Sequence, residues 1–431
     1  MKILLTGASG FIGNLLARTL RDAGHSLTCV LRNPEQVSLP GVELLRLDFS
    51  RALKPSDWEA ALRGMDVVVN TVGIFREKPG SSFDTLHRAA PCALFAAAAR
   101  AGVRHVVNFS ALGADEGAAT AYHRSKKAAD DYLLGLGIRA SVVQPSLVYG
   151  PGGASAALFE SLASLPLTPV PGRGGQMIQP VHVDDVLRAV AALVEQADGP
   201  SRRIAMAGPE PVSLRHYLAA LRAAMRIGRK ARFVPVPRAF MYFAARFARW
   251  MPGLPFDASA LRMLDRGNTA SADAIRALLG GRPRGPAEFV DPAYAAAVAA
   301  KARLRWLLPV LRFSVAVVWI VTGVVSLGLY PVHDSFALLA RAGTPGWLMP
   351  VFLYGAAGLD FALGALTLLG RRSRRLWVAQ ALLVLFYTAV ITWAMPEFWL
   401  HPYGPVLKNL PFLALLWLLY ETEEGRWTTS R

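Results

Sequence analysis

A tyrosine and a lysine four residues apart, Tyr122 and Lys126, have the types and spacing that suit proton transfer. They lie in AYHRSKKAADDYLL, a segment typical of a helix, so this spacing puts them on one face. An ammonium beside a phenol favours the phenolate and lowers the phenol's pKa, which makes it a usable general acid for a carbonyl that receives hydride. Ser110, just past an expected strand, can hydrogen-bond the same oxygen. The alternative is an ordinary amphipathic surface pair.

The N-terminal segment MKILLTGASGFIG allows two interpretations, a secretory signal or a phosphate-binding loop. A signal needs an apolar core of about 7–15 residues, and here the run is short and is followed by Gly7, Gly10 and Gly13. A helical pattern and then a second strand follow, which is the context in which spaced glycines carry weight. Such glycines permit a tight turn, close approach of a pyrophosphate and close packing of the helix, whose N-terminus favours phosphate. The segment therefore predicts dinucleotide binding.

The second expected strand, HSLTCVLRN, indicates which dinucleotide binds. Folds that bind NAD place a carboxylate near the end of this strand, where it holds the ribose 2′-hydroxyl. This strand ends at Arg32 with no carboxylate, and a guanidinium there can hold a 2′-phosphate. The pattern favours NADP(H) over NAD(H), and the alternative is a solvated surface arginine.

Four further strands are expected in VELLRLDFS, MDVVVNTVG, VRHVVNFSALGA and RASVVQPSLVYGPGG. Helical patterns such as HRAAPCALFAAAARAG alternate with them. This alternation predicts an α/β fold with a doubly wound parallel sheet, whose sites lie at the carboxyl ends of the strands.

These motifs resemble the short-chain dehydrogenase/reductase superfamily, in its extended or atypical branch. TGASGFIG, the Ser110, Tyr122, Lys126 constellation, PSLVYGPGG and QPVHVDDVLRAV carry the resemblance. It covers residues 1–280 and is closest to reductases related to the accessory Rossmann subunit of mitochondrial complex I. The resemblance implies catalytic roles for Ser110, Tyr122 and Lys126 and an epimerase-like fold with a substrate lobe at about residues 200–280. It also implies cofactor contacts from Thr6, Gly7, Ser9, Gly10, Phe11, Ile12, Gly13, Arg32, Asp48, Asn70, Val72, Gly73, Lys126, Pro145 and Val148.

Two segments of this half leave alternatives open. His182 and Asp185 invite a second acid/base site, but the resemblance favours a structural turn in which Asp184 or Asp185 caps a helix. FMYFAARFARWMP fits either a membrane-surface helix or a lobe helix whose aromatics face the core.

The composition of the 431-residue chain requires an explanation for excess apolar residues and excess positive charge. Hydrophobic residues make up 53%, the mean hydropathy is +0.33 and the formal net charge is +17. Basic residues that flank membrane spans explain the charge, so nucleic acid is not expected as a partner. Cys29 and Cys92 lie far apart and beside no histidine cluster, so neither a disulfide framework nor a metal site is expected.

The last third of the sequence predicts an all-α membrane domain with four transmembrane helices. The spans are WLLPVLRFSVAVVWIVTGVVSLGLY, WLMPVFLYGAAGLDFALGALTLLG, LWVAQALLVLFYTAVITWAM and a shorter VLKNLPFLALLWLLY. The layout and HPYGPVLKNLP resemble the DoxX-like family over 305–431, after a linker and lead-in helix at 281–304. Of the ionisable residues in these spans, Arg312 is close enough to the start of the first span to reach the membrane surface. Asp360 has two possible roles: it takes part in proton transfer or quinone chemistry, or it pairs with Arg312 or Lys408 and holds the helices together.

The basic segments KARLR and RRSRR set the expected orientation. Both should be cytoplasmic, which puts both termini and the nucleotide-binding domain on that side of the inner membrane. Two functions then compete. One is a membrane-anchored NAD(P)H-dependent oxidoreductase acting on a lipophilic carbonyl, alcohol or quinone-like substrate. The other is a non-catalytic NADP(H)-binding regulatory or assembly protein with a membrane-protein partner or a second copy of itself.

Overall fold

The structure, a computed structural model, describes residues 1–196, 198–247, 258–369 and 373–423. It divides into two compact units, Met1–Arg303 and the chain from Leu304 onwards. Each unit is described by itself. The domain boundaries expected near residues 280 and 305 remain a prediction.

A seven-stranded sheet forms the centre of the first unit, and every neighbouring pair of its strands is parallel. The six strands expected from the sequence are confirmed, and a seventh joins them at one edge. In spatial order the strands are β11 (Arg202–Met206), β6 (Ala140–Pro145), β5 (His105–Phe109), β4 (Val67–Asn70), β1 (Lys2–Thr6), β2 (Ser26–Leu31) and β3 (Glu43–Arg46). The chain reverses direction across the sheet between β1 and β4, which is where such sheets bind ligands.

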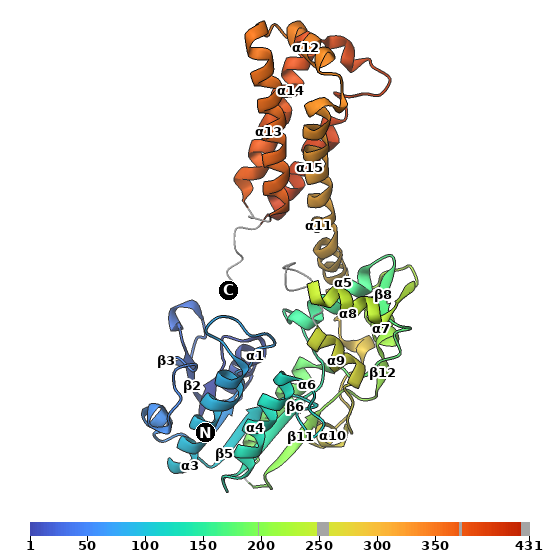
Figure 1. The fold of residues 1–431 in the computed structure, drawn as a ribbon. Coiled ribbons are helices and arrows are strands. Elements are labelled where there is room, and N and C mark those ends of the chain that lie inside the picture. The colour runs from blue at the N-terminus through green and yellow to red at the C-terminus, as the bar shows by residue number, and fades with distance from the viewer. Residues whose placement is uncertain (197, 248–257, 370–372, 424–431) are drawn as a thin grey trace. The chain divides into compact units, whose positions relative to one another are not determined.

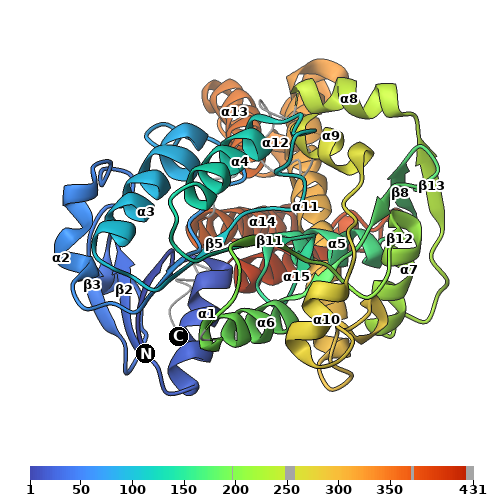
Figure 2. The ribbon, with the colours of Figure 1, turned by 90° about the horizontal axis from the view of Figure 1, so that it is seen from below.

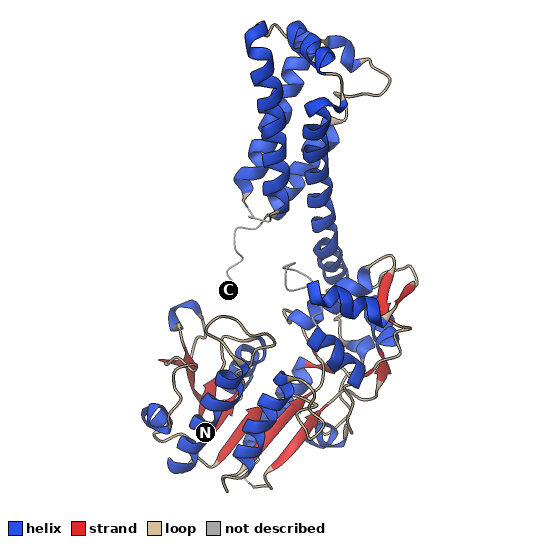
Figure 3. Ribbon diagram, in the orientation of Figure 1, coloured by secondary structure: helices blue, strands red, loops and turns tan. Residues whose placement is uncertain are grey.

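Helices cover both faces of this sheet, as the doubly wound pattern predicts (Figures 2 and 3). Side chains of a strand alternate between faces, so Ile3 and Leu5 enter one core while Leu4 enters the other. The first face packs against α1 (Phe11–Asp22), α6 (Val183–Glu195) and α10 (Asp273–Leu279), and the second against α2 (Glu59–Leu62), α3 (Ala90–Arg100) and α4 (Ala121–Leu134).

A smaller lobe in the same unit has its own core. It contains Tyr149, Phe159, Tyr217 and Phe289 and the first turns of α11 (Ala295–Val324). Its helices are α5 (Ala154–Ser164), α7 (Leu214–Ala224), α8 (Arg238–Phe247) and α9 (Ala258–Arg266). Its strands pair as β7 (Val148–Tyr149) with β10 (Val181–His182), β8 (Thr168–Pro171) with β13 (Phe233–Val236), and β9 (Met177–Ile178) with β12 (Val212–Ser213).

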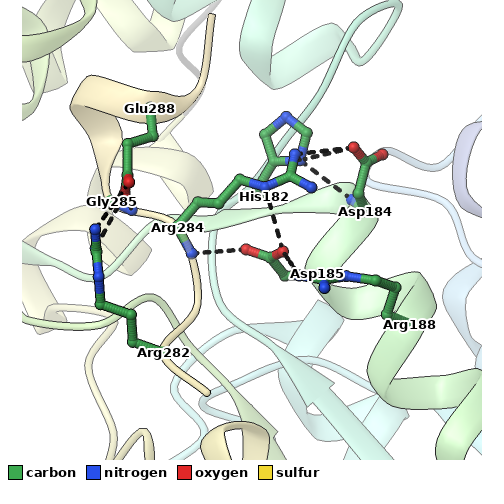
Figure 4. A network of polar contacts seen from close by, with 8 residues as sticks. All are labelled: His182, Asp184, Asp185, Arg188, Arg282, Arg284, Gly285 and Glu288. Carbon is green, nitrogen blue, oxygen red and sulfur yellow. Dashed lines mark hydrogen bonds and ion pairs between the residues drawn. The ribbon is translucent and has the colours of Figure 1, made fainter. Parts of the chain in front are cut away.

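A polar network ties the segment around Arg284 to the start of α6 (Figure 4). Asp185 is fully buried and accepts hydrogen bonds from Arg284 N and from Arg188 Nη2, each at 2.7 Å. Arg284 Nη1 donates to Asp184 Oδ2 at 2.9 Å. The expected aspartate cap is wrong, because His182 Nδ1 is the group that accepts from Asp184 N, at 3.2 Å. The contacts support the structural interpretation of this turn rather than a second acid/base site.

The second unit is helical (Figure 1). Its core draws on α11 (Ala295–Val324), α13 (Met349–Leu368), α14 (Arg374–Ala394) and α15 (Asn409–Thr422), and α12 (Val332–Arg341) joins α11 to α13. Within the described residues, three helices, Ala295–Leu329, Met349–Leu368 and Arg374–Ala394, are long and apolar enough to cross a membrane. α15 has 14 residues, about 21 Å at ~1.5 Å per residue, against a hydrocarbon core of about 30 Å. A fourth span therefore remains a prediction.

The ionisable residues of this unit have different surroundings. Arg312 Nη2 donates to Glu423 Oε2, which also accepts from Trp377 Nε1 at 2.9 Å. Asp360 is 3% exposed, and in the described part of the chain its Oδ1 has no hydrogen-bond partner. Lys408 is exposed. The acid bound to Arg312 is thus Glu423, which sequence reasoning did not consider, and a role for Asp360 remains a prediction. The RRSRR segment lies partly outside the described residues.

Candidate functional site

Two glycines that flank the turn between β1 and α1, Gly7 and Gly13, have no room for a side chain. Gly7 has a φ of +83°, and a Cβ there would lie 2.5 Å from Thr71 Oγ1. A Cβ on Gly13 would lie 2.2 Å from the carbonyl oxygen of Gly7. Gly10 precedes α1, and no side chain caps the helix there. The first backbone N–H groups of α1 can therefore donate hydrogen bonds to a ligand. This cradle fits the pyrophosphate of a dinucleotide.

A second element of the site is a basic cavity of about 480 Å³ past the ends of β2 and β3. Arg32, Arg51 and Lys78 line it together with Asp48. Burial acts to raise the pKa of Asp48, but hydrogen bonds from Ser50 and the charges of Arg32 and Arg51 outweigh it and hold that pKa below its ordinary value. Three cations and one carboxylate leave this cavity suited to an anionic group.

Helix α4 presents Tyr122, Lys126 and Asp130 at four-residue intervals, and this spacing gives them one face. Lys126 Nζ donates to the carbonyl oxygens of Val72 at 3.0 Å and Phe109 at 2.9 Å. These two carbonyls follow β4 and end β5, so the lysine lies at the carboxyl edge of the sheet. A Cβ on Gly73 would lie 3.2 Å from the same Nζ. Lys126 therefore lies beside the strand ends, and its catalytic role remains a prediction.

Aromatic rings surround Tyr122. Phe75 stacks on it with ring centroids 5.4 Å apart, and His87 and Phe83 meet it edge-on at 5.4 and 5.9 Å. The expected lowering of its pKa is wrong, because burial raises the pKa of Tyr122 above its ordinary value and the charge of Asp130 raises it further. The ammonium of Lys126 donates to two backbone carbonyl oxygens and not to the phenol of Tyr122. The phenol therefore enters any reaction at neutral pH in its protonated form.

His87 stays neutral beside this tyrosine. Burial lowers its pKa to about 3, and the charge of Lys126 acts in the same direction. Its Nε2 accepts from Ile74 N at 3.0 Å, so Nδ1 carries the proton and faces Ser125 Oγ at 3.0 Å. The imidazole thus fixes the loop after β4 instead of acting as an acid.

The hydroxyl of Ser110 is committed to a carboxylate. Ser110 Oγ donates to Asp130 Oδ2, and Asn108 Nδ2 donates to Asp130 Oδ1 at 2.8 Å. Asp130 is fully buried, which raises its pKa, and the nearby charge of Lys126 opposes that rise. While Asp130 is ionised, Ser110 can offer lone pairs but no proton to another group.

A chain of buried hydrogen bonds joins this carboxylate to the glycine loop. Thr6 Oγ1 donates to Asn70 Oδ1 at 2.7 Å, and Asn70 Nδ2 donates to Asn108 Oδ1 at 2.8 Å. Asn108 then donates to Asp130. An ionised carboxylate only accepts, so Asp130 sets the direction of every donor in the chain. Thr6 and Asn70 were predicted to contact a cofactor. Their side chains are buried and take part in this chain of hydrogen bonds, next to the glycine loop.

The remaining predicted residues lie along the same edge. Ser9 and Gly10 are exposed in the loop, and Phe11, Ile12 and Val72 are half-buried. Pro145 ends β6 and Val148 begins β7. The structure therefore brings the loop, strand ends and catalytic candidates to one edge, whereas Arg32 and Asp48 lie at the separate basic cavity.

Sequence reasoning missed Asp130, Asn108, His87 and Phe75. The sequence holds a weak signal for Asn108 and for Asp130. Asn108 is a polar residue near the end of an otherwise apolar strand, and the register pairs it directly with Asn70, which was predicted. Asp130 lies four residues after Lys126, on the helix face already assigned to the site. Nothing in the local sequence identifies His87 or Phe75, which reach Tyr122 from other segments.

Two parts of the chain match known protein families. Residues 7–156 match the NAD(P)H-binding family, and residues 316–417 match the DoxX-like family. The first match covers the glycine loop and the Tyr122 helix, and the second covers most of the second unit.

Individual proteins resemble the first unit more distantly. The chain is 27% identical to the ceramide reductase of Caulobacter vibrioides over 194 residues, which are 44% of this chain and 60% of that protein. It is also 27% identical to mitochondrial NADH dehydrogenase (ubiquinone) 1 alpha subcomplex subunit 9 of Arabidopsis thaliana over 243 residues, which are 54% of this chain and 59% of that protein. The chain thus spans about three fifths of the length of these relatives.

A solved structure shows the same fold. A nucleoside-diphosphate-sugar epimerase from Staphylococcus aureus superposes with a TM-score of 0.54 at 20% identity, covering 67% of this chain and 99% of that one. At this identity the likeness shows the fold alone.

Proposed function

We propose that this chain, which joins an NAD(P)-binding Rossmann domain to a C-terminal DoxX-like domain, is a membrane-bound oxidoreductase that interconverts a carbonyl and an alcohol on a lipophilic substrate. The observation that carries the proposal is the α4 face. It sets Tyr122 and Lys126 beside the strand ends that neighbour the glycine cradle. When bound, the nicotinamide would supply or accept the hydride.

The residues of the chain divide the other tasks. The glycine loop and the N-terminus of α1 hold the phosphates, and Lys126 orients the ribose side from its anchor on the carbonyls of Val72 and Phe109. Tyr122 carries a proton at neutral pH because burial raises its pKa. It can therefore donate that proton to the oxygen of a carbonyl as the alcohol forms.

The cofactor we propose is NADP(H) in preference to NAD(H). Support comes from the basic cavity, where Arg32, Arg51 and Lys78 can bind a 2′-phosphate through charge-assisted hydrogen bonds. Among the described residues, Asp48 is the one carboxylate that lines this cavity, and Ser50 holds it through two hydrogen bonds.

A lipophilic substrate is supported by three observations. Phe75, which stacks on Tyr122, is 78% exposed and offers an apolar wall beside the acid. The DoxX-like match and the three apolar helices indicate a membrane protein. One relative is named a ceramide reductase, and ceramide is a lipid.

We also propose four spans with both termini on the cytoplasmic side.

The test is Tyr122→Phe in full-length protein held in a bilayer mimetic. Removing one hydroxyl should reduce NADPH-dependent turnover by about 10²-fold or more, the usual scale for a positioned acid. NADPH affinity should stay near the wild-type value, because the phosphates are held elsewhere. Tyr132→Phe is the matched control, since Tyr132 lies on the same helix and is 42% exposed. A Tyr122→Phe protein as active as wild type would remove this residue from the mechanism.

Lys126→Met should behave differently from Tyr122→Phe. It should weaken NADPH binding as well as turnover, because the resemblance to short-chain dehydrogenases/reductases implies that this lysine also contacts the cofactor. If wild-type protein binds NADPH yet oxidises it with none of a panel of lipid carbonyls and quinones, the non-catalytic alternative takes its place. This alternative is supported by the similarity to subunit 9 of the plant NADH dehydrogenase, which is a subunit of a larger assembly.

A further inference from the structure

We propose that the α7–α8 side of the lobe is a docking surface for anionic phospholipid headgroups of the bilayer that holds the chain. This basic surface consists of the segment Ser213–Phe233 and the exposed face of α8. The proposal needs no enzymatic activity and stands apart from the proposed function.

A cavity of about 570 Å³ lies in the Ser213–Phe233 part of the basic surface. Arg215, His216, Arg229 and Lys230 line it, and no aspartate or glutamate does within the part of the chain that the structure describes. Among the described residues, Arg215, Arg229 and Lys230 form no ion pair with a carboxylate. Cations gathered without acids create a positive potential that attracts an anion.

The cavity is built into the fold. Arg222 is buried and donates to the carbonyl oxygens of Ala163 at 2.7 Å and Leu165 at 2.9 Å, so it anchors α7 to the end of α5. Its Nε also donates to Arg229 O at 2.6 Å, which fixes the loop that carries the other cations. Arg215 lies over the ring of Phe233, 5.0 Å from its centroid. These contacts hold the positive groups around one space.

The charge imbalance extends along the sequence. Residues 211–247 contain eight Lys or Arg residues and no Asp or Glu. One acid reaches α8 from α9: Asp265 lies 3.7 Å from Arg238 and accepts from Tyr242 at 2.8 Å. The charges around the cavity therefore remain in excess after this pair is counted.

Exposed aromatics distinguish a lipid surface from a site for a soluble anion. Phe240 and Phe243 lie three residues apart on α8 and are 61% and 60% exposed. A helix with basic residues and exposed phenylalanines is typical of the interface between headgroups and acyl chains. Of the two interpretations of FMYFAARFARWMP, this exposure favours the membrane-surface helix for its described part.

Chain connectivity keeps the lobe near a bilayer. Ala295, Ala299 and Ala302, in the first turns of α11, share a core with Tyr217 and Leu221 of α7. The apolar run expected to enter the membrane begins at residue 306, a few residues later. Helix α7 is therefore packed on the segment that leads directly into the first candidate span.

The experiment compares hydrogen exchange of full-length protein in nanodiscs of neutral phosphatidylcholine and in nanodiscs with about 30% phosphatidylglycerol. Amides of residues 226–243 should exchange about tenfold more slowly in the anionic discs, and high salt should remove the difference. Unchanged exchange between the two lipids would overturn the proposal.

A charge-neutralised variant tests the residues themselves. Arg215→Gln/Arg229→Gln/Lys230→Gln should lose the protection. The control Arg18→Gln/Arg63→Gln/Arg100→Gln should keep it, because these exposed arginines belong to α1, the end of α2 and α3, which cover the sheet and are not part of the basic surface. Exchange in β1–β6 should be unchanged in both variants, which confirms that they fold. Protection that survives the first variant, or that inorganic phosphate alone reproduces in neutral discs, would contradict docking on anionic lipid.

Discussion

Replacing Asp130 should weaken the fold around the site by an amount that depends on the replacement. Asp130 is buried and accepts from Asn108 Nδ2 and Ser110 Oγ, and its charge acts on the buried ammonium of Lys126. Asp130→Ala removes the acceptor of both donors and the charge opposite the lysine. Asp130→Asn keeps an oxygen for Asn108, and its amide N–H can donate to Ser110 Oγ once that hydroxyl turns around.

The contacts set the size of the two effects. Each buried donor left without an acceptor costs about 1–3 kcal/mol, and loss of the charge near the buried ammonium of Lys126 adds to this cost. The effects overlap, so we expect Asp130→Ala to lower the local free energy of opening by about 3–5 kcal/mol. Asp130→Asn loses only the charge, and the carboxylate no longer has to be desolvated, so its loss should be about 1–2 kcal/mol.

Native-state hydrogen exchange of β5 and α4 in full-length protein measures this free energy. The matched control is Asp131→Asn, the neighbouring residue, whose exposed carboxylate pairs with Lys127 and Arg203 and should contribute about 1 kcal/mol or less. If Asp130→Ala and Asp130→Asn fell within about 1 kcal/mol of each other, the hydrogen bonds would not be the source of the stability. If neither variant differed from wild type, Asp130 would not be a buried acceptor.

Four further predictions address the cofactor, pH and topology. Arg32→Asp should lower NADPH affinity about tenfold or more, ~1.4 kcal/mol, with little change for NADH, as measured by fluorescence titration; equal wild-type affinities would contradict it. Gly13→Ala should abolish binding of both, because its Cβ has no space. His87 has a lowered folded pKa of about 3, so the unfolded chain binds this proton first and stability is lost as pH falls below about 6.5; His87→Gln should flatten that dependence in thermal unfolding. Reporter fusions after Tyr330 and Arg375 should read outside and inside.

Short-range patterns in the sequence were enough to predict much of the molecule. The glycines at 7, 10 and 13, the alternation of strands and helices, and the apolar runs after residue 305 are properties of consecutive residues. Backbone conformation, helix period and the length of an apolar run act over a few residues, so each can be recognised without knowing its neighbours in space. The parallel sheet and the helical second unit were predicted on that basis, and the structure confirms both.

The chemistry of the site depended on residues that the chain brings together from distant positions. Burial by Phe75, Phe83 and His87, together with the charge of Asp130, raises the pKa of Tyr122, whereas the Tyr-x-x-x-Lys spacing alone predicts the opposite. A pKa depends on every group within several ångströms, and most of these groups are remote in sequence.

The local structure follows from residues that are close in sequence, whereas the chemistry of the site follows from contacts between distant residues. Sequence placed Ser110, Tyr122 and Lys126 at the carboxyl edge of a nucleotide-binding sheet and put apolar helices at the end of the chain. Only the packed structure shows that the proton of Ser110 points to Asp130 and that Arg215 and Arg229 line the same cavity. Local backbone preference can be predicted from neighbouring residues, but hydrogen-bond direction and electrostatic potential arise only after distant segments have been brought into contact.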